Sequence, residues 1–314
     1  MKEKTKTDSS PLVSILLPTH NRPDYFEIAL KSALAQTYGN VEIVVSDNGT
    51  NDETARRIEP YLQAFQHIHY FRRPGMSPVD NWDRCFELSK GEYINYLMDD
   101  DVFLPDKITR MMACFLANPK VGIVTSFREL IDDQGRRIPN LLGTERLFSQ
   151  DTLLKGSEFG RFMLVNGSNV IGEPTTALIK RKDIPNGFGY FGGVRYKLMT
   201  DVATWLSILA HSDCIYLTNP LSYFRIHGGQ DQKTQKNVQI NASIEWFHFA
   251  LDAIHNRWFY NSAEEAVDQL TQKLPAFRQF VIDHYVDDPK SLYHLDDINK
   301  VFDRAQAVVH GKIQ

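Results

Sequence analysis

The stretch Tyr93-Ile94-Asn95-Tyr96-Leu97-Met98-Asp99-Asp100-Asp101 joins a short apolar run to three consecutive aspartates. Gly91 opens the run, and its aromatic and aliphatic residues are typical of a buried strand. A strand that is buried along its length and then presents three carboxylates holds them at one end of a sheet. Three like charges this close repel one another, so a bound cation would relieve them.

Oxygen ligands of this kind favour Mg²⁺ or Mn²⁺, which proteins usually hold with one or two carboxylates and the phosphates of a substrate. The three aspartates therefore predict a divalent-cation site. For this stretch taken alone, the alternative is a solvated acidic turn before the helix that follows Pro105, because Asp is common in turns and near helix N-termini.

The sequence around this stretch alternates apolar strands with amphipathic helices. We expect strands at 13–17, 41–45, 68–71, 92–98 and 121–124, and helices at 23–36, 51–65, 78–89 and 105–117. This pattern indicates an α/β fold with a mostly parallel sheet covered on both faces. Ligands bind beyond the carboxyl ends of such strands. Here these ends carry the polar clusters 19–22, 47–48 and 99–101, which we expect at one edge.

The pattern changes after residue 124. We expect a hairpin at 127–138, helices at 149–165 and 201–211, strands at 176–179, 214–217 and 221–225, and helices from 237 onward. An apolar stripe of the last region contains Ile240, Ile244, Phe247, Leu251, Ile254 and Trp258. This stripe predicts packing against the preceding domain or against a second subunit, with membrane-surface contact as the alternative.

The composition is that of a soluble globular protein, with 42% hydrophobic and 24% charged residues in a chain of 314. A net charge of −4 gives no basic footprint and argues against nucleic acid as a partner. No apolar run is long enough to cross a bilayer, and residues 1–10 lack the apolar segment of a signal peptide. Three isolated cysteines, Cys85, Cys114 and Cys214, are typical of reduced thiols. We therefore expect a cytoplasmic protein, with the inner face of the membrane as an alternative location.

Three segments together carry a resemblance to a known family: Val13–Arg22 (VSILLPTHNR), Val41–Asp52 (VEIVVSDNGTND) and Gly91–Asp101 (GEYINYLMDDD). In order and spacing they resemble glycosyltransferase family 2, which has the GT-A fold, a Rossmann-like sheet. The similarity is clear over about the first 125 residues, is weaker to about His227, and leaves out the final helices. It implies transfer of a sugar from an activated nucleotide sugar to an acceptor hydroxyl, with inversion at the anomeric carbon.

The resemblance places the nucleotide at the ends of the first two strands. Pro18, Thr19, Asn21 and Arg22 match the loop that grips the nucleotide, with Arg22 toward a phosphate. Asp47 matches the aspartate that accepts a hydrogen bond from N3–H of uracil or thymine, so the implied donor is a UDP- or dTDP-sugar. As plain turn chemistry, Pro18 ends a strand, Asn21 turns the chain and Asp47 forms an Asx turn.

The resemblance also implies Mn²⁺ or Mg²⁺ as the cofactor. Asp101 matches the metal ligand, while Asp99 and Asp100 join the nucleotide set, with Asp99 at the ribose hydroxyls or a metal-bound water. His227, within Arg-x-His-Gly-Gly, is expected as a third metal ligand, and Arg225 is expected near the donor sugar and its phosphates. A satisfied polar histidine is the alternative for His227.

Asp201 matches the family's general base, which takes the proton of the acceptor hydroxyl at the start of a helix after a flexible loop. Thr200 stands where the family more often has Glu, and Asp at a helix N-terminus is also favoured as a cap alone. Glu173 and Trp82 are expected at the sugar or acceptor, with core packing as the alternative for Trp82. The implied acceptor is a bacterial polysaccharide, a glycan or a lipid-linked saccharide.

The resulting domain organisation has a polar lead-in, a catalytic domain and a helical appendage. The lead-in is 1–11, and the catalytic domain is 12–235, with a nucleotide-binding half at 12–125 and an acceptor-binding half at 126–235. The helical region is 236–314, through which a homodimer is an open expectation. Two other classes remain: a nucleotidyltransferase of related fold and a non-catalytic nucleotide-sugar-binding protein. A nucleotidyltransferase would normally have a glycine-rich first loop, and residues 19–23 contain no glycine.

Overall fold

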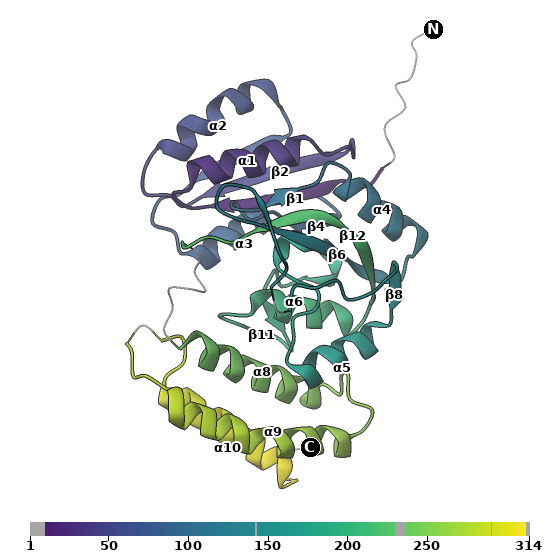
Figure 1. Ribbon diagram of the computed structural model, residues 1–314, viewed down its shortest axis with the longest axis vertical. Coiled ribbons are helices and arrows are strands. Elements are labelled where there is room, and N and C mark those ends of the chain that lie inside the picture. Colours follow the sequence, from purple (N-terminus) through teal and green to yellow (C-terminus); the bar gives the residue numbers. More distant parts are fainter. Residues whose placement is uncertain (1–9, 142, 230–236, 290, 312–314) are drawn as a thin grey trace. The chain divides into compact units, whose positions relative to one another are not determined.

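The computed structural model describes residues 10–141, 143–229, 237–289 and 291–311 and divides into two compact units (Figure 1). The first unit comprises Met1–Leu153, Ile171–Phe188 and Cys214–Ile226, and the second comprises Leu154–Val170, Gly189–Asp213 and His227–Gln314. Most of the expected lead-in and the expected domain boundary at residue 235 lie outside the described residues.

The first unit is built on a ten-stranded sheet with the order β3-β2-β1-β4-β9-β6-β12-β5, to which β7 adds on β6 and β8 on β12. The strands are β1 Val13–Thr19, β2 Val41–Asp47, β3 Ile68–Arg72, β4 Tyr93–Tyr96, β5 Val102–Phe103, β6 Val121–Ile131, β7 Arg137–Ile138, β8 Thr152–Leu154, β9 Leu178–Lys180 and β12 Asp213–Arg225. Strands β3, β2, β1 and β4 are parallel, and β9 is antiparallel between β4 and β6. The mostly parallel α/β sheet expected from the sequence is confirmed.

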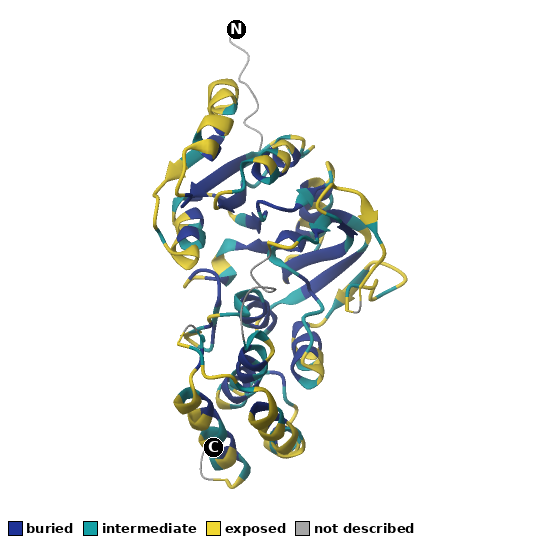
Figure 2. Ribbon diagram, turned by 60° about the vertical axis from the view of Figure 1, so that its left-hand side comes forward, coloured by how far each residue is buried: buried dark blue, intermediate teal, exposed yellow. Residues whose placement is uncertain are grey.

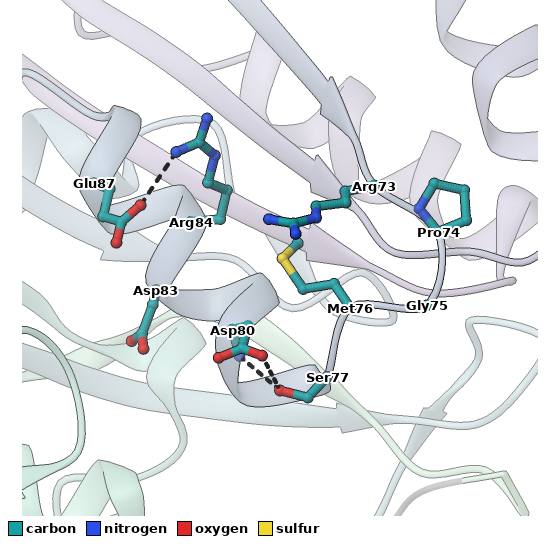
Figure 3. A pocket seen from close by; sticks show the side chains of 9 residues that line it. All are labelled: Arg73, Pro74, Gly75, Met76, Ser77, Asp80, Asp83, Arg84 and Glu87. Carbon is teal, nitrogen blue, oxygen red and sulfur yellow. Dashed lines mark hydrogen bonds and ion pairs between the residues drawn. The ribbon is translucent and has the colours of Figure 1, made fainter.

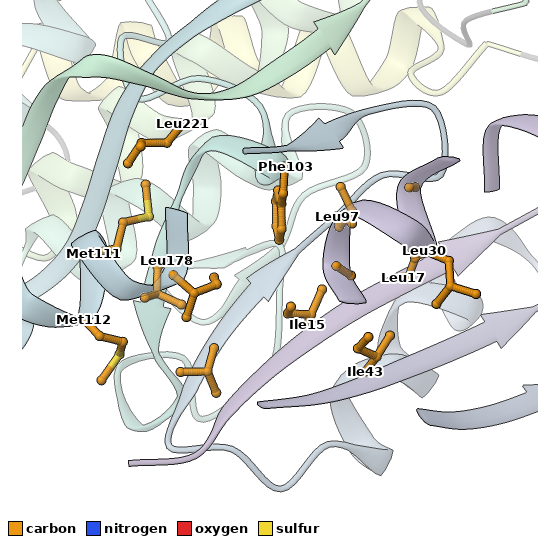
Figure 4. Packing of buried hydrophobic residues seen from close by; sticks show 14 of the residues in the cluster. Ile15, Leu17, Leu30, Ile43, Leu97, Phe103, Met111, Met112, Leu178 and Leu221 are labelled. Carbon is orange, nitrogen blue, oxygen red and sulfur yellow. The ribbon is translucent and has the colours of Figure 1, made fainter. Parts of the chain in front are cut away.

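Helices cover this sheet, and the alternation of side chains along the strands decides which face each helix covers. The helices are α1 Pro23–Leu34, α2 Glu53–Ala64, α3 Pro78–Leu88 and α4 Lys107–Ala117. Ile15 and Leu17 of β1 pack into one cluster with Leu30 of α1 and Met111 of α4 (Figure 4). The strands are largely buried (Figure 2), and α3 packs along β1 and β2 through Cys85, whose thiol faces the Val44 carbonyl of β2. Apolar residues on both sides of β1 explain why it is buried along its whole length.

The register of the central strands brings the polar strand ends to one edge. Thr19 is the partner of Asp47 at the ends of β1 and β2, and Leu16 is the partner of Tyr96 at the end of β4. The Leu97 N–H still bonds the Leu16 carbonyl at 2.8 Å, so the chain leaves β4 alongside β1 before the aspartates begin. The convergence predicted from the three clusters is therefore present.

Several local predictions differ from the structure. The helix expected from residue 149 begins at Gly156, as α5 Gly156–Asn166, because residues 152–154 instead form β8 on the sheet. The two strands expected at 214–217 and 221–225 are one continuous strand, β12, since Asn219 and Pro220 interrupt the apolar pattern without ending the strand. The predicted hairpin is confirmed as β6 and β7.

The second unit is mainly helical. It contains α5, the antiparallel pair β10 Tyr190–Phe191 and β11 Val194–Arg195, α6 Thr200–Leu209, α8 Val238–His255, α9 Ala263–His284 and α10 Leu295–Val309. The contacts thus group α5 and α6 with the C-terminal helices, whereas the sequence placed them in the domain ending at residue 235. Among the described residues, no helix has the length and apolar composition needed to span a membrane.

The apolar stripe of α8 is covered inside the second unit. Ile240, Ile244, Phe247 and Leu251 share one buried cluster with residues of α9 and α10, such as Phe277. The stripe was expected to meet the preceding domain, a second subunit or a membrane surface. The structure corrects that expectation for these four residues, because the two helices that follow α8 bury them. Trp258 instead packs against Phe191 and His211, which the sequence placed in the preceding domain.

Candidate active site

The strand ends of the first unit gather a cluster of polar groups around Asp99. The Thr19 hydroxyl donates to Asp99 Oδ2 at 2.9 Å, and the His20 N–H donates to the same oxygen at 3.3 Å. Asp99 is 3% exposed, and burial raises its pKa to about 6, with the neighbouring Asp100 adding to the rise. Arg22 and Thr19 act in the opposite direction. The predicted nucleotide residues Thr19, Arg22, Asp99 and Asp100 therefore lie together.

Arg22, at the start of α1, carries the positive charge of this cluster. Its Nη1 lies 3.1 Å from Asp99 Oδ1 and 3.0 Å from Asp100 Oδ2. The Arg22 side chain is 28% exposed. One arginine thus links two of the three strand-end acids, while its expected contact with a donor phosphate stays a prediction.

Asp101 accepts two hydrogen bonds from neighbouring groups of the protein. Its Oδ1 accepts the Arg225 N–H at 3.0 Å, and its Oδ2 accepts the Thr175 hydroxyl at 2.5 Å. Asp101 is 1% exposed, and burial raises its pKa well above the ordinary value, with further contributions from Asp100 and Glu173. Among the described ion pairs, none involves Asp101.

The chemistry of these groups fits a hard divalent cation. Asp101 is a buried carboxyl group that has no Lys or Arg partner among the described ion pairs, so a bound dication would compensate its negative charge when it is ionised. In the part of the chain that the structure describes, no three His, Cys, Asp or Glu side chains converge into a metal cage. Mg²⁺ in particular is often held by one or two carboxylates and substrate phosphates, an arrangement that requires no such cage.

Arg225 and Glu173 lie at the same edge in contacts of their own. Arg225 is 2% exposed, donates from Nε to the Asp100 carbonyl at 2.7 Å and from Nη1 to the Asp132 carbonyl at 2.9 Å. Its guanidinium also stacks over the Tyr25 ring. Glu173 Oε1 lies 3.1 Å from Arg128 Nε. Through these contacts Arg225 holds the backbone of the turn that carries the three aspartates. Contacts of Arg225 and Glu173 with a sugar stay predictions.

Asp47 is fully buried at the end of β2. Its Oδ1 accepts the Gly49 N–H at 2.7 Å, which is the turn contact considered as the alternative, and its Oδ2 accepts the Tyr70 hydroxyl at 2.7 Å. Arg72 Nε lies 3.8 Å from the same Oδ2. Asp47 is predicted to accept N3–H of a nucleobase. That N3–H and the Tyr70 hydroxyl therefore compete as donors to the same carboxylate.

Asn21 joins the loops that follow β1 and β2. It has a positive φ of 51°, which Asn tolerates better than most residues. Its Oδ1 accepts the Thr50 N–H at 2.9 Å, and its Nδ2 donates to the Thr50 hydroxyl at 3.0 Å. Pro18 is buried within β1. Both residues shape the edge, and a direct nucleotide contact stays a prediction for each.

A cavity of about 500 Å³ lies between the loop 73–77 and α3 (Figure 3). The loop is tied to the strand-end site, because the Arg73 N–H bonds the Asp47 carbonyl at 2.9 Å and Asn48 Nδ2 bonds the Met76 carbonyl at 2.7 Å. Its lining residues are Arg73, Pro74, Gly75, Met76, Ser77, Asp80, Asp83, Arg84 and Glu87. Two residues that line the cavity, Arg73 and Met76, are therefore hydrogen-bonded to Asp47 and Asn48 at the end of β2.

Trp82 of α3 belongs to an aromatic cluster. Its ring stacks on Tyr96 with centroids 5.0 Å apart and meets Phe188 at 5.5 Å. The Tyr96 hydroxyl also donates to the Trp82 carbonyl at 3.2 Å. These contacts agree with the core-packing alternative, and the half-buried indole leaves a sugar contact as a prediction.

Asp201 and His227 belong to the second unit. Asp201 lies in the first turn of α6, where its Oδ1 accepts the Val202 N–H at 2.8 Å and its Oδ2 accepts Asn169 Nδ2 at 2.8 Å. His227 Nδ1 accepts the Gly229 N–H at 3.2 Å. The acids of the strand ends belong to the first unit, so the roles of these two residues toward them stay predictions.

Sequence reasoning missed three contact residues of these groups: Thr175 on Asp101, Tyr70 on Asp47 and Asn169 on Asp201. Thr175 lies two residues after Glu173, which was expected at the sugar or acceptor, and Asn169 lies between Gly167 and Gly172. The sequence shows Thr175 and Asn169 but does not show which carboxylate each of them contacts.

Comparison with known proteins identifies the family of the chain. The family model "Glycosyl transferase family 2" matches residues 14–188. An uncharacterised glycosyltransferase of Rickettsia felis is 35% identical over 251 residues, which cover 79% of this chain and 40% of that protein. The chain thus spans about 40% of the length of this relative.

Solved structures show the same fold at low identity. S. aureus TarS 1-349 in complex with UDP matches with a TM-score of 0.62 and 15% identity, over 95% of this chain and 83% of that chain. Its complex with UDP-GlcNAc matches with a TM-score of 0.55 and 14% identity, over 96% of this chain and 91% of that one. Fold and strand-end site together define the class of GT-A glycosyltransferases. Within that class, the chain belongs to glycosyl transferase family 2.

Proposed function

We propose that the protein transfers a sugar from a UDP- or dTDP-sugar to a hydroxyl of a saccharide or related acceptor, with Mn²⁺ or Mg²⁺ and with inversion. The observation that carries this proposal is the buried acid cluster Asp99–Asp101 at the ends of parallel strands. Family membership favours a glycosyltransferase over a nucleotidyltransferase. The UDP and UDP-GlcNAc complexes of the structural neighbour support a uridine nucleotide as the first donor to test.

The first unit would bind the donor. Asp47 would accept N3–H of the base. Asp99 would accept ribose hydroxyls in addition to the Thr19 hydroxyl and the His20 N–H, which donate to its Oδ2. Asp101 would hold the cation together with the donor phosphates, with His227 as a further ligand. When bound, the cation stabilises the charge that develops on the leaving diphosphate.

The second unit would supply the base. The Asp201 carboxylate would take the proton of the acceptor hydroxyl while that oxygen forms a bond to the anomeric carbon from the face opposite the nucleotide. The bond from the anomeric carbon to the diphosphate oxygen breaks, and the nucleoside diphosphate leaves with the electron pair. Asn169 Nδ2 orients one Asp201 oxygen at 2.8 Å.

The test combines a binding assay with a turnover assay. A thermal-shift panel of nucleotide sugars, each with and without Mn²⁺, identifies the donor, because a ligand stabilises the folded state according to its affinity. The variant Asp201→Asn should keep the donor-induced shift and lose at least about 100-fold in turnover, the low end of the usual contribution of a general base. Full turnover in this variant would remove Asp201 from its role, and binding without any turnover in the unaltered protein would favour a non-catalytic sensor.

A further inference from the structure

A buried carboxylate of the C-terminal helices binds the segment that leads into α6. Glu245 lies on α8 and is 0% exposed. Its Oε1 accepts the N–H groups of Lys197 and Leu198, each at 2.9 Å, and its Oε2 accepts the Met199 N–H at 2.6 Å. The Tyr293 hydroxyl donates to Oε1 at 2.7 Å. Four donors thus converge on one side chain that the proposed reaction does not use.

The N–H groups that Glu245 accepts belong to the three residues immediately before the first residue of α6, Thr200. Successive backbone N–H groups attract a negative charge, which explains why one carboxylate collects all three. The N-cap residue of α6, Met199, forms no side-chain cap. Glu245, 46 residues further along the chain, fixes this N-cap residue by accepting its N–H.

A second pair of contacts fixes the same segment. The Tyr196 hydroxyl donates to Asp252 Oδ2 at 2.8 Å, and Arg304 Nη2 donates to Asp252 Oδ1 at 2.8 Å. The Tyr196 ring also stacks on Phe249, with centroids 4.1 Å apart. Residues 196–199 are therefore attached to α8 at both ends, and α10 supports one of the two attachments through Arg304.

We propose that Glu245 is the positioning residue for Asp201, and hence that the C-terminal helices are part of the acceptor side of the active site. The proposal rests on the proposed function, in which Asp201 is the base. Asp201 is two residues beyond Met199, and its Oδ1 is bonded to the Val202 N–H in the first turn of α6. Any rotation of the start of α6 would therefore change the direction in which the Asp201 carboxylate points. Glu245 prevents that rotation by holding three successive N–H groups.

The test uses the whole chain of 314 residues with Glu245→Gln, which keeps the size of the side chain but replaces one acceptor oxygen with an NH₂ group. We expect kcat to fall at least tenfold, with the affinity for UDP changed less than twofold, because the predicted nucleotide residues lie in the first unit. Amide hydrogen exchange at 197–201 should accelerate. The matched control is Glu264→Gln, an exposed acid on α9, which should leave all three quantities unchanged.

Two further variants keep the outcome decisive. If Glu245→Gln does not fold, Tyr293→Phe removes one donor from the same carboxylate and leaves the three backbone bonds, and it should lower kcat severalfold with UDP affinity retained. A lower melting temperature with unchanged kcat for the folded protein would show a purely structural role and overturn the proposal. Asp201→Asn, measured in parallel, separates the two hypotheses: if it keeps turnover, the base assignment fails, and if it alone loses turnover, only the role of Glu245 fails.

Discussion

Replacing Thr175 by Val tests how the protein holds Asp101. Thr175 is fully buried, and its hydroxyl donates to Asp101 Oδ2 at 2.5 Å while accepting the Met98 N–H at 3.2 Å. Valine has nearly the same shape, so the substitution removes two hydrogen bonds without opening a cavity. Any effect then reports on the hydroxyl and not on packing.

The expected magnitude follows from these two contacts. A hydrogen bond to a charged group contributes about 1.5–3 kcal/mol, and a buried N–H left without its acceptor costs about 1–3 kcal/mol. The additional buried methyl group returns roughly 0.8 kcal/mol. We expect Thr175→Val to lower the free energy of unfolding by about 3 kcal/mol, which is roughly 6–12 °C in melting temperature for a domain of this size.

The same variant should weaken the cation site. Groups that orient a metal ligand typically contribute about 10–100-fold to metal affinity, so Thr175→Val should weaken Mn²⁺-dependent UDP binding at least about tenfold. Thr176→Val is the matched control, because its hydroxyl donates to the carbonyls of Ile171 and Glu173, not to Asp101. Urea unfolding and calorimetric titration measure both quantities. Equal losses of affinity in the two variants, or none in Thr175→Val, would refute the reasoning.

Two further variants test a buried lysine and a partly buried tyrosine of the first unit. Burial lowers the pKa of Lys107 from the ordinary 10.5 to about 7, so between these values only the unfolded chain holds the proton and stability rises with pH by about 1.4 kcal/mol per unit. Between pH 7.5 and 9.5, the free energy of unfolding of the unaltered protein should rise with this slope relative to that of Lys107→Met. Parallel pH profiles of the two proteins would contradict the lowered pKa of Lys107. Tyr70→Phe removes the hydroxyl that competes for Asp47, so UDP should bind severalfold tighter while CDP does not. Unchanged UDP affinity would count against Asp47 as the base-reading residue.

The sequence predicted those parts of the molecule that leave a local pattern. The apolar runs of β1, β2 and β4 located the sheet, and polar residues after each run located the edge where Thr19, Asp47 and Asp99 meet. The parallel arrangement then followed from the alternation with helices, because parallel strands need such crossovers. The fold and the edge of the sheet where these polar residues converge could therefore be predicted from the sequence.

Contacts between distant segments left no such pattern. Thr175 reaches Asp101 across 74 residues of sequence, and Glu245 reaches Met199 across 46. Each partner is an ordinary residue of its own segment, and only the packing of the strands or helices brings the pair together. The cover of the α8 stripe was missed for the same reason, since amphipathicity shows that a face is buried but not what buries it.

The central claim is that the strand-end acids bind a nucleoside diphosphate through a divalent cation at Asp101. Calorimetric titration of UDP into the unaltered protein and into Asp101→Asn, each with and without Mn²⁺, measures this directly. We expect Mn²⁺ to strengthen UDP binding at least about tenfold in the unaltered protein. In Asp101→Asn we expect Mn²⁺ to leave UDP binding unchanged, because the replacement removes a carboxylate ligand. UDP binding that is indifferent to Mn²⁺ in the unaltered protein, or equally strengthened in both proteins, would contradict it.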